Sequence, residues 1–150
     1  LEKKKIKYYS CIKELNKDKY KLMFLNTKEY DNENDNSNVI YTELDGYKFM
    51  FMGDAGIEKE KDILDKYSIS NIDVLKVGHH GSKTSSSKEF INEINPKYNI
   101  ISVGKNNRYG HPNKEVLNNL SDSKIYRTDQ DGSIMVKIKK NKLRIEAYSP

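Results

Sequence analysis

One aspartate and three histidines, all set in glycine-containing runs, are the residues of this sequence best suited to metal chemistry. Asp54 lies in Gly-Asp-Ala-Gly, the adjacent His79 and His80 lie in Gly-His-His-Gly-Ser, and His111 lies in Tyr-Gly-His-Pro. Imidazole nitrogen and carboxylate oxygen are ligands that zinc and manganese take in hydrolases, where an open coordination position binds water and lowers its pKa. Asp54 and one of the two adjacent histidines are therefore candidate metal ligands.

The pattern leaves open which of His79 and His80 would bind a metal. Neighbouring side chains of an extended segment point in opposite directions, so we expect one histidine to bind metal and the other to contact substrate or support a ligand. Simpler roles also fit: a turn or helix cap for Asp54, a polar loop for the histidine pair, and a helix start for His111. All four residues are candidate catalytic residues.

Three polar residues close to the histidines in sequence could contact a phosphate group. Ser82 and Lys83 follow the histidine pair, and Arg108 precedes His111. Hydroxyl groups and cations hold phosphate oxygens at such positions, although as isolated features they are more often solvated loop residues. The candidate substrate-binding residues are therefore Ser82, Lys83, Arg108 and His111.

Each candidate residue comes after an apolar segment that is typical of a buried strand. The segments 47–52, 72–77 and 98–103 are apolar, and each runs into one of the glycine-containing loops. Helical spacing follows each loop, which predicts an α/β (layered α+β) fold. The other expected elements are strands at 8–15, 19–26, 39–44, 124–127, 133–139 and 142–148, a hairpin turn at Asp45–Gly46, a loop at 27–38, a helix through 57–67, a helix capped by Ser86 with Glu89, a helix starting at Pro112, and a turn at 129–132.

The composition limits the class of protein. The 150 residues fit one domain, and no apolar run approaches the roughly 20 residues of a transmembrane helix. The single cysteine, Cys11, has no second cysteine in this chain for a disulfide or a thiolate metal site. The net charge of +5 favours anionic partners such as nucleic acid, but a coding bias toward lysine is the simpler explanation.

Five runs, at 34–39, 53–54, 75–85, 103–112 and 126–132, occur in an order that resembles the hydrolase region of the ComEC/Rec2 family of metallo-β-lactamase-fold proteins. The resemblance covers about the last four-fifths of the chain. It implies the C-terminal half of an αββα sandwich. It also implies a metal-bridging carboxylate at Asp54, a terminal metal histidine at His79 or His80, and a cleft residue at His111 that engages the substrate or leaving group.

The activity implied by this resemblance is that of a bacterial hydrolase that cleaves phosphodiester bonds in DNA with a zinc or manganese two-metal centre. The family's His-x-His-x-Asp-His motif, which supplies most of the ligands, does not occur in these 150 residues. We therefore expect residues 1–150 to be a single partial domain that lacks the N-terminal half and, as this fragment, binds no metal tightly and is inactive.

Two further expectations concern partners. Half of a sandwich exposes one face of its sheet, so the missing N-terminal half or a second copy of the chain is expected to cover it. The alternative to a hydrolase is a non-catalytic module on the same fold that binds nucleic acid or a partner. The sequence does not distinguish a soluble parent protein from the soluble domain of a membrane protein.

Overall fold

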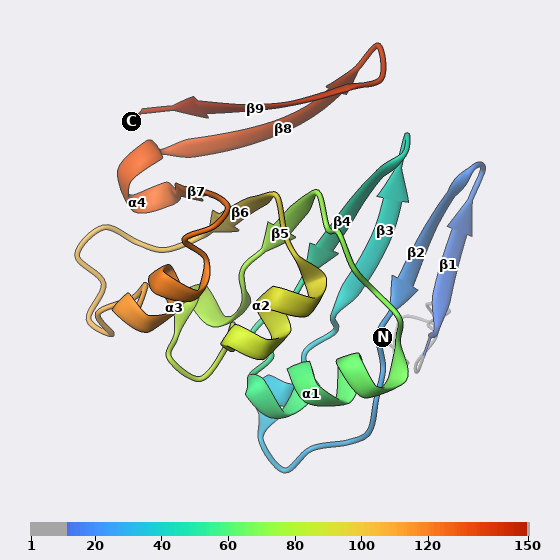
Figure 1. The fold of residues 1–150 in the computed structure, drawn as a ribbon, viewed down its shortest axis with the longest axis horizontal. Helices are drawn as coiled ribbons and strands as arrows, with labels where there is room; N and C mark the ends of the chain where they lie inside the picture. The colour runs from blue at the N-terminus through green and yellow to red at the C-terminus, as the bar shows by residue number, and fades with distance from the viewer. Residues whose placement is uncertain (1–11, 150) are drawn as a thin grey trace, which may run out of the picture.

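The computed structural model describes residues 12–149, which form a seven-stranded mixed sheet, a separate two-stranded hairpin and several short helices (Figure 1). The strands are β1 (Glu14–Lys17), β2 (Tyr20–Phe24), β3 (Ile40–Leu44), β4 (Tyr47–Phe51), β5 (Val74–Lys76), β6 (Tyr98–Ile101), β7 (Lys124–Arg127), β8 (Ser133–Lys139) and β9 (Lys142–Tyr148). The helices are α1 (Ile57–Lys66), α2 (Lys88–Ile94), α3 (Lys114–Asn119) and α4 (Thr128–Asp131), with 3₁₀ turns η2 (Glu33–Asn36) and η3 (Gly78–Gly81).

The strands of the large sheet lie side by side in chain order, and their direction changes in the middle. β1 to β4 pair antiparallel, whereas β4 to β7 pair parallel. The expected turn joins β3 to β4, where Asp45 and Gly46 have φ angles of 48° and 83°. Because β4 to β7 are parallel, their carboxyl ends meet at one edge of the sheet, which is where the loops with the candidate residues begin.

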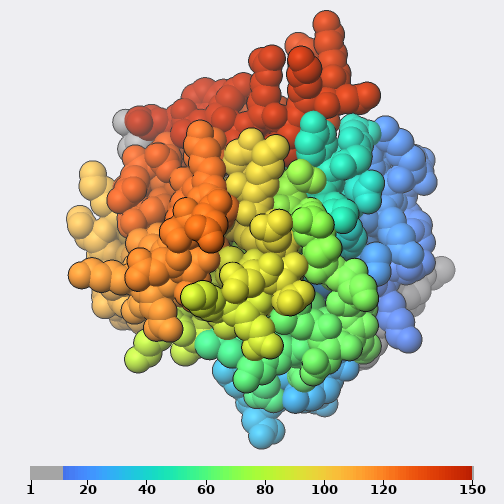
Figure 2. All heavy atoms as spheres, in the orientation of Figure 1, coloured from blue at the N-terminus to red at the C-terminus, as the bar shows by residue number. Residues whose placement is uncertain are grey.

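Helices α1, α2 and α3 cover one face of the sheet (Figure 1). Met50 and Leu75, paired on β4 and β5, are fully buried beneath them, and α2 adds Phe90 and Ile94 to the same core. Burying a side chain of this size contributes roughly 1.5–3 kcal/mol. Figure 2 shows the atoms of α1 and α2 closed over the middle of this face, with β1 and β2 (blue) beyond them at the edge. This layering confirms the predicted α/β fold class.

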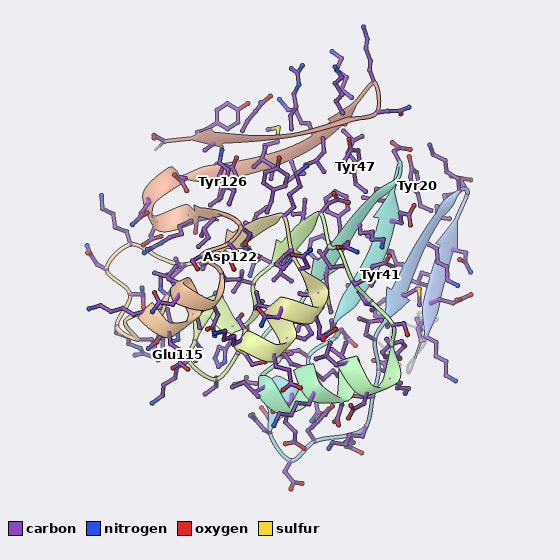
Figure 3. All side chains as sticks on the ribbon, in the orientation of Figure 1. Tyr20, Tyr41, Tyr47, Glu115, Asp122 and Tyr126 are labelled. Carbon is purple, nitrogen blue, oxygen red and sulfur yellow. The ribbon has the colours of Figure 1, made fainter. Side chains whose placement is uncertain are left out.

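The opposite face of the sheet is apolar and incompletely covered. Side chains alternate along a strand, so Phe49 and Phe51 point away from the helices; Phe49 is buried and Phe51 is 41% exposed. The β8–β9 hairpin is fastened to the start of β4, because the Tyr47 hydroxyl donates to the Asn141 carbonyl (3.0 Å) and accepts from the Leu143 N–H (3.2 Å). Figure 3 shows Tyr47 below the hairpin. Cover for this face by further residues or a second copy stays a prediction.

Helix α2 begins one residue later than its capping pattern predicted. Its N-cap is Ser87, whose hydroxyl accepts a hydrogen bond from the Phe90 N–H at 3.3 Å. Ser86 has a φ of 57°, and its N–H donates to the buried Glu60 carboxylate of α1. The prediction that Ser86 caps the helix was wrong, because a contact with a distant helix takes Ser86 out of the capping position.

Three other expectations about elements need correction. Helix α3 begins at Lys114 rather than Pro112, because the Asn113 side chain caps it by accepting from the Glu115 N–H (3.0 Å). The expected turn at 129–132 is largely a single helical turn, α4. The expected strand at 8–15 lies mostly outside the described residues. Within residues 12–149, no helix is both long and apolar enough to cross a membrane.

Candidate metal site

The candidate residues converge at the carboxyl edge of the parallel strands. Asp54 follows β4, the histidine pair forms η3 after β5, and His111 ends the loop 102–111 that follows β6. The His79 N–H donates to the Gly53 carbonyl at 3.0 Å, and the Asn113 N–H donates to the Gly81 carbonyl at 2.8 Å. These backbone bonds tie the three loops together, so strands far apart in sequence place their candidate side chains at one site.

The two adjacent histidines lie in a tight turn, not in the extended segment that the sequence suggested. His79 and His80 have φ angles of 44° and 56°, and their rings are 6.5 Å apart at an interplanar angle of 64°. The turn ends at Gly81, which packs closely against Pro112. Only glycine fits there, because a Cβ on residue 81 would lie 2.6 Å from Pro112 Cβ. The two rings therefore have different surroundings.

His80 is the histidine that faces Asp54. Its Nε2 lies 3.7 Å from Asp54 Oδ1, and its Nδ1 lies 2.7 Å from the Ser102 carbonyl oxygen. A carbonyl only accepts hydrogen bonds, so Nδ1 carries the proton and the lone pair of a neutral ring is on Nε2. Metal-ligating histidines are commonly oriented in this way, by a hydrogen bond from the ring nitrogen that does not bind the metal.

The donor atoms of this pair suit one metal ion. The 3.7 Å between His80 Nε2 and Asp54 Oδ1 is shorter than two zinc–ligand distances of about 2.1 Å laid end to end, so one ion could contact both atoms. Both side chains are about half exposed. Among residues 12–149, no group of three or more potential His, Cys, Asp or Glu ligands occurs. The described residues therefore offer a pair of potential ligand side chains, fewer than the three protein ligands of a catalytic zinc site.

His79 and His111 lie next to each other, beside Asp54 and His80. The His79 ring lies 6.1 Å from that of His111, and its Nδ1 is 3.4 Å from the Thr84 hydroxyl. Burial, followed by the neighbouring charges of His79 and His80, lowers the pKa of His111 from its ordinary value of 6.5. The lowered pKa favours the neutral form of His111, which can both donate and accept a hydrogen bond.

The predicted phosphate contacts differ in accessibility. The Ser82 side chain is nearly buried, and its hydroxyl is 3.0 Å from that of Thr84, which stabilises the loop. Lys83 lines a pocket of about 490 Å³ together with Asp54 and His79. Arg108 is exposed on the loop 102–111 and donates to the Tyr109 hydroxyl at 2.6 Å. Their contact with substrate stays a prediction for all three.

The other wall of this pocket comes from residues for which the sequence predicted no individual role. Asn32 and Asn34 line it, and both lie in the loop that connects β2 to β3. Buried Asp35 fixes this loop, because its Oδ1 accepts from the Gly56 N–H at 2.7 Å and its Oδ2 from Asn32 Nδ2 at 3.1 Å. The Asn-rich sequence of this loop predicted a turn. It did not predict the hydrogen bond from the Gly56 N–H to Asp35, because the two residues are 21 positions apart in the chain.

Comparison with known proteins agrees with this fold. The model of the metallo-beta-lactamase superfamily matches residues 12–105, and the chain therefore belongs to that superfamily. It is 41% identical over 120 residues to ComE operon protein 3 of Bacillus subtilis, a match that covers 79% of this chain and 16% of that protein. This chain is also 37% identical to the competence protein ComA of Neisseria gonorrhoeae, over 74% of this chain and 17% of that protein.

A third relative is recombination protein 2 of Haemophilus influenzae, 32% identical over 76% of this chain and 14% of that protein. Together these matches confirm the resemblance to ComEC/Rec2-type proteins of the metallo-β-lactamase fold. The chain spans less than a fifth of the length of each of these relatives.

Proposed function

We propose that this chain is the C-terminal half of a metal-dependent phosphodiesterase domain that acts on DNA, and that it contributes Asp54 and His80 as ligands. The observation that carries the proposal is the approach of His80 Nε2 to Asp54 Oδ1, with His80 Nδ1 oriented by the Ser102 carbonyl. The similarity to proteins named for competence and recombination supports DNA as the substrate. Superfamily membership supports metal-dependent chemistry.

We propose a role for each residue on the basis of its position. Zinc or manganese, when bound, supplies Lewis acidity and lowers the pKa of water. Asp54 and His80 would hold the metal, and the second carboxylate oxygen of Asp54 would be free to contact a second ion. Lys83, in the pocket beside Asp54, places positive charge where a phosphate would lie. His111, on the far side of His79, would donate a hydrogen bond to the substrate or leaving group.

We further propose that the remaining ligands come from residues outside this chain. Catalytic zinc sites use three protein ligands and an open position, whereas the described residues offer the pair Asp54 and His80. The half-exposed state of both side chains leaves room for such ligands. This chain alone would then be inactive, and the uncovered sheet face would be the docking surface of the missing half.

DNA cleavage by the protein with and without the proposed upstream residues tests this function. We expect cleavage of DNA that depends on manganese or zinc only in the longer form, and its loss in Asp54→Ala and His80→Ala. Lys114→Ala, an exposed cation on α3, is the matched control and should leave cleavage unchanged. DNA binding without cleavage in the longer, metal-loaded form would favour the non-catalytic module instead.

A further inference from the structure

Tyr109 holds an aromatic ring in solvent next to the candidate metal site. The residue is 66% exposed, the largest exposed fraction among the exposed large hydrophobic residues of 12–149. Its ring stacks with that of His111 at a centroid distance of 5.8 Å and an interplanar angle of 19°. His111 in turn lies 6.1 Å from His79, which lines the pocket with Asp54. A row of rings therefore leads outward from the site and ends in the exposed ring of Tyr109.

The loop that carries Tyr109 is braced by one side chain. Asn107 Oδ1 accepts from the His111 N–H at 2.9 Å, while Asn107 Nδ2 donates to the carbonyls of His111 (2.7 Å) and Gly104 (3.2 Å). These three bonds join the two ends of the loop across Tyr109. Because the backbone is already held, little conformational entropy is lost when a ligand packs on the ring.

Arg108 adds a planar cation to this ring. Its guanidinium carbon lies 4.8 Å from the Tyr109 ring centroid, and one of its nitrogens donates to the Tyr109 hydroxyl at 2.6 Å. Both residues are exposed. Aromatic rings and guanidinium planes are the surfaces on which single-stranded nucleic-acid bases stack, and the positive charge attracts the adjoining phosphates.

We propose that Tyr109, with Arg108 beside it, is a subsite that stacks an unpaired nucleobase next to the phosphate held near Asp54. The subsite rests on the proposed function, since it presupposes a nucleic-acid substrate. In an intact duplex each base is covered on both faces by its neighbours, so only an unpaired or frayed base can lie on the ring. The subsite therefore makes the protein prefer single strands and open ends.

Binding measurements with matched strands test the subsite without requiring catalysis. The probes are a fluorescent single-stranded oligonucleotide, an abasic strand of the same length and charge, and the corresponding duplex. Stacking of one base predicts that Tyr109→Leu weakens binding of the base-bearing strand roughly 5- to 100-fold and leaves the other two unchanged. Tyr109→Phe keeps the ring and loses only the hydroxyl that accepts from Arg108, so it should retain most of the affinity for the base-bearing strand.

Tyr20→Leu is the matched control, because Tyr20 is a partly exposed tyrosine at the opposite end of the sheet (Figure 3). Equal loss of affinity for the base-bearing and abasic strands in Tyr109→Leu would overturn the subsite, as would no loss for either. Those outcomes leave the proposed hydrolase intact. Failure of the longer, metal-loaded protein to cleave any strand, with the base-dependent loss still present, would instead refute the hydrolase and retain the subsite.

Discussion

Glu60 is the buried carboxylate that fastens the end of the histidine loop to helix α1, and its removal should destabilise the protein strongly. Its two oxygens accept hydrogen bonds from the backbone N–H groups of Ser86 and Ser87, and its residue is 1% exposed. Glu60→Ala leaves the buried Ser86 N–H without its partner, at roughly 1–3 kcal/mol, and the partly buried Ser87 N–H without its partner at a smaller cost. Release from the cost of burying a carboxylate offsets part of this, so we expect a net loss of about 2–4 kcal/mol.

Glu60→Gln should cost less, about 1–2 kcal/mol, because the amide keeps one acceptor oxygen but presents its NH₂ group to the other donor. Urea unfolding at pH 7 gives both values. The control is Glu58→Ala on the same helix, where an exposed carboxylate pairs with Lys28 and should contribute little. A Glu60→Ala protein as stable as the Glu58→Ala control would refute the assignment of Glu60 as a buried anchor.

The same residue gives a pH dependence of known sign. Burial raises the pKa of Glu60 above its ordinary value of 4.5, and the backbone N–H groups of Ser87 and Ser86 oppose this only in part. The native state therefore binds the proton more tightly than the unfolded state, so stability falls as pH rises from about 4.5 through the raised pKa. The stability advantage over Glu60→Gln should shrink across this window. An advantage that grew with pH would show that the sign is wrong.

Three further substitutions test the packing around the site and the hairpin. Gly81→Ala places a Cβ 2.6 Å from Pro112 Cβ at a φ of +81°, and should lower the free energy of unfolding by at least about 2 kcal/mol in urea titrations. Asn107→Ala should speed amide hydrogen exchange across the loop 102–111, whereas the exposed Lys105→Ala should not; equal rates in both variants would contradict the bracing role. Tyr47→Phe removes both hydroxyl bonds to the β8–β9 hairpin, and should cost about 1 kcal/mol and raise protease sensitivity within that hairpin.

Much of the fold could be predicted because its signals are local. The turn Asp45–Gly46 and the apolar runs that became β4 to β6 follow from backbone preference and period. The errors arose where a distant partner decides the local structure. Ser86 is drawn away from its helix by Glu60, 26 residues earlier, and no pattern within a few residues encodes that contact.

The candidate site likewise has features that local sequence predicts and features that depend on distant contacts. The sequence predicted that Asp54 and the histidine pair each follow a strand, and the parallel order of β4 and β5 brings those strand ends together. The proposal that His80 is the ligand depends on the carbonyl of Ser102, which belongs to a different loop. The pocket wall at Asn32 and Asn34 depends on how buried Asp35 docks its loop onto Gly56.

Metal content of single variants tests the central claim that Asp54 and His80 are the ligands of this half. The measurement is zinc and manganese stoichiometry and affinity in the protein that includes the proposed upstream residues. We predict that Asp54→Ala and His80→Ala lose a bound ion or weaken its binding by more than about 100-fold, while His79→Ala changes it by less than about 10-fold. Loss of metal in His79→Ala with retention in His80→Ala would contradict the assignment.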